Sequence, residues 1–173
     1  MKTPAITPIS QEFDFKTVPS WYVLCTNNAC PLRQDCMRFH AGSQAPDSLE
    51  SAHCVMPNTL KDGETLHTDP LTLESTWTSA NGKYLNLSLL VKTGVEEGLD
   101  ARQTLGIVIS NVTELGDGTH HYDLVFYHHQ NGVPEYYTTR VYSSIPTSFF
   151  KSGDTATLTI HTYQGTVVKD YQF

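Results

Sequence analysis

Four cysteines lie close together in the first third of the chain, and their type and spacing suit the binding of a metal ion. A tetrahedral zinc site needs four soft or borderline ligands that converge on one ion. Cys36 and His40 are four residues apart, so a helix would place both on one face. The sequence therefore predicts a metal site, with zinc as the ion. Two ligand sets fit it: Cys25, Cys30, Cys36 and His40, or the same three cysteines with Cys54.

The second ligand set consists of cysteines alone, and such a site could also hold an iron–sulfur cluster. Two states without a metal stay open. In a secreted chain the four cysteines would form two disulfides, and otherwise they would be free thiols that pack as small apolar side chains. Residues 1–8 contain a lysine but no apolar stretch, so we expect no signal peptide, a cytoplasmic location and reduced thiols. The cell envelope is the alternative if a signal peptide was removed.

Composition narrows the classes of partner. The chain has 173 residues, of which 39% are hydrophobic, and a net charge of −7. An acidic chain is poorly suited to nucleic acid or to an anionic membrane surface. No apolar run approaches the ~18 residues of a membrane-spanning helix. The sequence also contains no phosphate-binding loop, no hydrolase nucleophile motif and no zinc-protease motif, which favours a protein that is not an enzyme.

Two histidine pairs, His120-His121 and His128-His129, form a second group of possible ligands. Eight residues of extended chain separate the pairs by about 26 Å, so one ion cannot bridge them along a single strand. We therefore expect these side chains at the surface. A metal site completed by another strand is the alternative.

Strands are the elements that must position these residues. After residue 70, apolar and polar residues alternate with a period of two. Segments that alternate and are rich in Val, Ile, Thr or aromatic residues predict strands. Turn signals such as Asn131-Gly132 separate them, and residues 94–104 are expected as a loop or one helical turn. The pattern predicts a mainly β protein, an antiparallel β-sandwich of about seven strands. The expected strands are 71–77, 85–91, 105–110, 122–129, 136–143, 156–163 and 166–173.

The distribution of cysteines and turn formers predicts the domain boundaries. Residues 1–57 form the small Cys-rich, metal-binding segment, residues 58–70 a linker rich in turn formers, and residues 71–173 the β-sandwich domain.

Three runs in the second half resemble a known family. The segments 82–88, 122–137 and 156–171 resemble the first core strand, a later strand–turn–strand unit and the last hairpin of the NigD-like C-terminal β-sandwich domain of Bacteroidales. The resemblance implies a β-sandwich. Members of that family are envelope lipoproteins of unknown role, with a signal peptide and a different N-terminal domain.

The N-terminal part carries two further resemblances. The series from Phe13-Asp14 to Cys36-Met37-Arg38 resembles a small bacterial family of unknown function, which implies the all-cysteine ligand set. The gaps between Cys25, Cys30, Cys36 and His40 resemble those of CCCH-type zinc fingers, which bind single-stranded RNA. The acidic surroundings oppose that activity, so nucleic acid is an unlikely partner.

These observations predict a non-enzymatic binding or interaction module with a structural metal site and a protein or glycan partner. One alternative is an envelope-associated β-sandwich that binds glycan or protein and whose cysteines form disulfides. A further alternative is an iron–sulfur protein or an RNA-binding finger.

Overall fold

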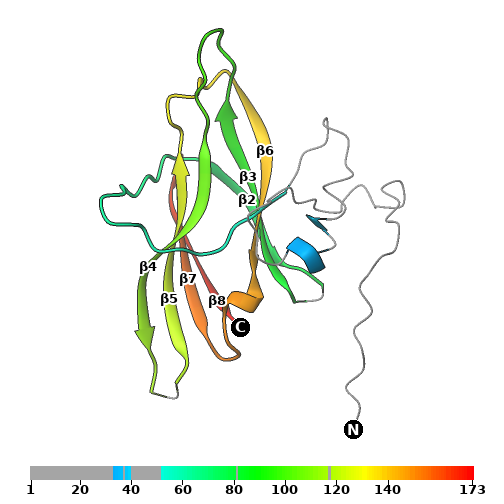
Figure 1. The fold of residues 1–173 in the computed structure, drawn as a ribbon, viewed down its shortest axis with the longest axis vertical. Coiled ribbons are helices and arrows are strands. Elements are labelled where there is room, and N and C mark those ends of the chain that lie inside the picture. The colour runs from blue at the N-terminus through cyan, green and yellow to red at the C-terminus, as the bar shows by residue number, and fades with distance from the viewer. Residues whose placement is uncertain (1–32, 37, 40–51, 81, 117) are drawn as a thin grey trace.

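The alternation of apolar and polar residues after residue 70 produces two β-sheets that pack face to face (Figure 1). The structure is a computed structural model that describes residues 33–36, 38–39, 52–80, 82–116 and 118–173. Its elements are η2 (Arg33–Asp35), β1 (Ala52–Cys54), β2 (Thr72–Thr78), β3 (Tyr84–Thr93), β4 (Thr104–Glu114), β5 (His120–His129), β6 (Tyr137–Pro146), η3 (Thr147–Phe149), β7 (Thr155–Thr162) and β8 (Gly165–Gln172).

Each sheet has four strands. The first, sheet A, has the order β1-β6-β3-β2, and the second, sheet B, has the order β4-β5-β7-β8. Most neighbours are antiparallel, but β1 pairs with β6 in parallel and β5 pairs with β7 in parallel. The second pair is parallel because the intervening strand β6 crosses to sheet A before the chain returns as β7.

The predicted sandwich and its strands are confirmed. Strands β2 to β8 correspond to the seven expected segments, with ends that differ by a few residues. Two of the six strand pairs, β1 with β6 and β5 with β7, are parallel, so both sheets are mixed. Residues 94–103 form an irregular loop with one turn, as expected.

The core lies between the two sheets and is built from alternate residues of the central strands. Leu85, Leu87 and Leu89 of β3 point inward and are at most 2% exposed. They meet Leu124 and Phe126 of β5, which face them from sheet B. Burial of each such side chain contributes about 1.5–3 kcal/mol, which makes this interface the main source of stability.

Residues 55–71, called here the connecting segment, run from β1 to β2 across the sandwich (Figure 1). The segment hydrogen-bonds to both sheets. The Val55 N–H donates to a carbonyl of β6, while Asn58 forms a bridge to β4. Further along, Thr68 forms a parallel bridge to β5 and Leu71 forms one to β7. The stretch expected as a linker, residues 58–70, is therefore fastened to β4 and β5 by backbone hydrogen bonds, and Leu71 directly after it bonds to β7.

A β-bulge in β2 directs one carboxylate across the outer face of sheet A. The register of β2 against β3 shifts between Leu73 and Ser75, and the extra residue is Glu74. Its carboxylate accepts two hydrogen bonds from Arg140, at 2.6 and 2.8 Å, and one from the Ser88 hydroxyl at 2.8 Å. The contacts with Arg140 and then Ser88 lower the pKa of Glu74 from 4.5 to about 2.

We expect Glu74→Gln to lower the stability of the fold at neutral pH and to lose this effect in acid. A carboxyl whose pKa is depressed in the folded state stabilises the fold above its unfolded pKa, here 4.5, and this contribution disappears as the pH falls to about 2. Denaturant unfolding of both proteins between pH 7 and pH 2 measures the gap. Glu97→Gln, in the exposed loop before β4, is the matched control. A gap that stays constant over this range would contradict the assignment.

Candidate functional site

Two of the predicted metal ligands, Cys36 and Cys54, fall within the described residues, whereas Cys25, Cys30 and His40 lie outside them. Cys36 follows η2 and Cys54 ends β1, so they belong to separate segments 18 positions apart. Both are buried, at 7% and 4% exposure, and the structure carries both as thiols. The structure therefore places two soft ligands of the predicted set in the protein interior.

Both cysteines reach the same aromatic side chain, Tyr84 at the start of β3. The Cys36 sulfur lies 3.3 Å from the Tyr84 hydroxyl, and Cys54 packs against Tyr84. Burial raises the pKa of Tyr84 above its ordinary value, and the hydrogen bond with Cys36 and the negative charge of either cysteine in its thiolate form raise it further. The phenol therefore keeps its proton, which it can donate to a sulfur.

Arg38 joins this group from the N-terminal segment. One of its terminal nitrogens donates to the Asn86 Oδ1 at 3.0 Å and to the Ser144 Oγ at 2.9 Å. Its guanidinium also lies 4.2 Å from the centre of the Tyr84 ring, in a cation–π contact. Cys36, Arg38, Cys54, Tyr84, Asn86 and Ser144 are called here the Tyr84 cluster.

The position of the Tyr84 cluster follows from strand alternation. Asn86 of β3 lies between inward-facing Leu85 and Leu87, so it points away from the core, and Ser144 is its direct partner on β6. The Ser144 hydroxyl donates to the Asn86 Oδ1 at 2.8 Å. Both are at most 2% exposed although they face outward. The outer face of sheet A is therefore covered at this point, and Arg38 belongs to what covers it.

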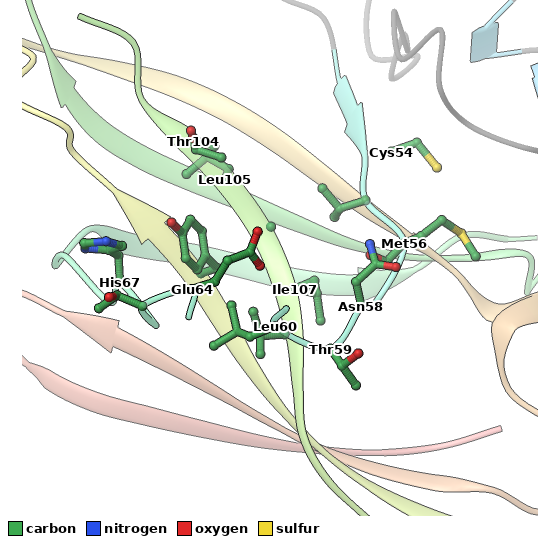
Figure 2. A pocket seen from close by; sticks show the side chains of 15 residues that line it. Cys54, Met56, Asn58, Thr59, Leu60, Glu64, His67, Thr104, Leu105 and Ile107 are labelled. Atoms are coloured by element: carbon green, nitrogen blue, oxygen red, sulfur yellow. The ribbon is translucent and has the colours of Figure 1, made fainter. Parts of the chain in front are cut away.

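A groove of about 580 Å³ begins beside this cluster. Cys54, several residues of the connecting segment, Thr104–Val108 of β4 and Tyr127 of β5 line it. Figure 2 shows Cys54 and His67 toward opposite ends of the lining. The groove thus extends from the end of β1 to sheet B, and its volume lies in the range of ligand pockets.

The polar groups of the groove are largely engaged in holding its walls. The Glu64 carboxylate accepts a hydrogen bond from the backbone N–H of Lys61 at 2.9 Å and closes a turn. His67 stacks on His129 and meets the edge of Tyr127. The groove therefore suits the binding of a ligand by its shape and partly apolar surface better than acid–base chemistry by its side chains.

A comparison with family models matches residues 9–67, about a third of the chain, to a family of unknown function (DUF6078). This confirms the resemblance of the N-terminal part to such a family, and it assigns no activity. No protein of curated function matches the chain significantly.

Solved structures of similar fold come from Bacteroides and Parabacteroides species. A NigD-like immunity protein from Bacteroides caccae has a TM-score of 0.55 and 24% sequence identity, over 72% of this chain and 66% of that one. A protein of unknown function (DUF1344) from Bacteroides vulgatus has a TM-score of 0.53 and 11% identity, over 70% and 57%. A toxin-related protein from Parabacteroides distasonis has a TM-score of 0.51 and 17% identity, over 69% and 61%.

These likenesses confirm the NigD-like sandwich as the fold of the second half. The chain spans less than two thirds of the length of each of the three proteins. Within the described residues, no helix is both long and apolar enough to cross a membrane.

The sequence interpretation missed the groove, because one of its walls is the stretch expected as a linker. It also placed the four paired histidines at the surface, which was wrong for His128, a side chain only 1% exposed. The available signal was alternation: His128 continues the inward series of Leu124 and Phe126 along β5.

Proposed function

We propose that the protein is a non-enzymatic binding module in which a zinc ion fastens the Cys-rich segment to the outer face of sheet A. The observation that carries this proposal is the meeting of two buried thiols, Cys36 and Cys54, at Tyr84. In this account Cys25 and Cys30 complete the ligand set, with His40 filling the fourth position if Cys54 does not.

The surroundings of the two thiols support a metal. Zinc takes thiolates as ligands, and a buried thiolate is costly unless a cation and hydrogen-bond donors compensate its charge. The Tyr84 hydroxyl lies within hydrogen-bond distance of the Cys36 sulfur and would donate to it in the thiolate form, and outer-shell donors of this kind orient and stabilise ligands. A short segment of about 50 residues also has too small a core to be stable alone, which a metal would offset.

The groove supports the binding part of the proposal, with an extended peptide segment of a partner protein as the ligand. Strand β4 is an edge of sheet B, and it hydrogen-bonds to Asn58 through the Ile107 carbonyl and the Ile109 N–H. Because backbone groups alternate along a strand, those of Leu105 point toward the same edge and into the groove region. An extended peptide could add to this edge, a common mode of peptide recognition.

Measurement of the metal content tests whether a zinc ion is bound by the cysteines. Reduced, anaerobically purified protein should contain zinc, and the cobalt-substituted form should show thiolate-to-cobalt charge-transfer absorption. Cys36→Ser should weaken this absorption strongly. Cys54→Ser and His40→Gln form a matched pair, of which only the variant that removes the true fourth ligand should change the spectrum.

The absence of thiolate-to-cobalt absorption from the wild-type protein would contradict a zinc site at the cysteines, called here the cysteine clamp. A mass increase on reduction equal to two opened disulfides would instead favour the disulfide alternative.

A groove-filling substitution tests the second part. A side chain at Gly106 would meet only the Tyr127 Cβ, at 3.8 Å, so Gly106→Val should fold normally while it occupies the groove. Peptides selected from a displayed random library against the full chain should bind Gly106→Val at least about tenfold more weakly, a loss of ~1.4 kcal/mol. Gly116→Val, at an open position outside the groove, is the control. Equal binding by all three proteins would show that the groove is not the site.

A further inference from the structure

Three side chains of metal-ligating type meet where the connecting segment reaches sheet B. They are His67 and Asp69 of the connecting segment and His129 at the end of β5, and one ligand atom of each lies within 4.8 Å of the others. All three residues are partly buried. Their positions in the sequence, two near 68 and one at 129, give no hint of this meeting.

Backbone pairing brings the three residues together. Strand β5 pairs with β7 only as far as Val125, which leaves its last residues available on that side. The connecting segment takes this place as a short parallel strand. The His67 carbonyl accepts a hydrogen bond from the His128 N–H at 3.0 Å, and the Asp69 N–H donates to the His128 carbonyl at 2.9 Å.

Side-chain contacts then fix Asp69. The Gln130 N–H donates to its Oδ2 at 2.6 Å, which orients the carboxylate. The His128 ring contacts the same residue, with its Nδ1 at 2.8 Å from the backbone carbonyl oxygen of Asp69. Because a carbonyl can only accept, this nitrogen carries the proton. The buried His128 therefore supports the group without being one of its three members.

The two outer histidine rings lie parallel. The ring centres of His67 and His129 are 3.6 Å apart with an angle of 7° between planes, and Tyr127 contacts His67 edge-on at 5.9 Å. Residues 127 and 129 share the face of β5 opposite to His128, which explains why these rings gather outside the core.

We propose that His67, Asp69 and His129 bind a divalent transition-metal ion, with zinc as the reference ion. Two imidazoles and one carboxylate form a ligand set that proteins use for zinc and for iron(II), with bonds of about 2.0–2.2 Å to zinc. The three donor atoms lie within 4.8 Å of one another. Rotation of the partly exposed side chains would bring each donor atom to bonding distance from a single ion. Three protein ligands leave a coordination position for water or for a donor atom of a bound molecule.

This ion would be independent of the one proposed for the cysteines. Its ligands are nitrogen and oxygen atoms, whereas the Tyr84 cluster offers sulfur. The two places also lie apart, since Cys54 and His67 occupy opposite ends of the groove lining in Figure 2. The new site would therefore place a Lewis acid at one end of the groove.

Titration of the full chain with zinc and with cobalt tests the site. Calorimetry measures the number and affinity of bound ions, and absorption reports the ligands of cobalt. His129→Gln and Asp69→Asn should each remove one equivalent of bound ion, or weaken it at least about 100-fold, more than the 10–100-fold typical of an outer-shell change. Any thiolate-to-cobalt absorption should stay as in the wild type, so failure of the cysteine clamp and failure of this site give different results. His161→Gln, on the neighbouring strand β7, is the matched control.

Retention of the full capacity and affinity by His129→Gln and Asp69→Asn would overturn the site. So would an equal loss in His161→Gln, because the effect would then not depend on the three ligands. His67→Gln provides a third ligand variant if one of the others does not fold, and thermal unfolding identifies such a case.

Discussion

The structure depends on a buried polar patch on the outer face of sheet A, the face that points away from the core. Asn86 and Ser144 face away from the core, yet they are nearly inaccessible to water. A buried polar group without a partner costs about 1–3 kcal/mol, so this face requires a cover that supplies hydrogen bonds. Arg38 of the N-terminal segment supplies two of them and also contacts Tyr84. The same patch thus ties Arg38 to the sandwich close to the point where Cys36 and Cys54 contact Tyr84.

The patch also determines the path of the chain that follows. Strand β1 pairs in parallel with β6, and the N–H of Val55 donates to the carbonyl of Ser144, the residue whose side chain Arg38 contacts. From this point the connecting segment leaves sheet A, forms one wall of the groove and pairs with β5 at His128. The groove and the group of His67, Asp69 and His129 are therefore both consequences of where β1 is held.

The sequence predicted local features well and long-range ones poorly. Period-two alternation located all seven strands from β2 to β8, because burial of one sheet face imposes it on each strand separately. The parallel pairing of β5 with β7 depends on the placement of β6 in the other sheet, which no local pattern encodes. Clustered cysteines predicted a common metal site; the structure shows only that Cys36 and Cys54 both contact Tyr84, and the site itself stays a prediction. The groove and the histidine–aspartate group depend on backbone hydrogen bonds of the connecting segment, whose turn formers indicated only a linker.

The central claim is that a metal ion at buried thiols holds the Cys-rich segment against sheet A. The most direct measurement is the rate at which a thiol reagent modifies Cys36 and Cys54 in the native protein, followed by peptide mass analysis, with and without a strong chelator. Both residues are buried, so both should react slowly before chelation. The account predicts that the chelator accelerates the reaction of Cys36, which belongs to both ligand sets, and that Cys54 follows it if Cys54 is the fourth ligand. Rates that do not change with the chelator would contradict it.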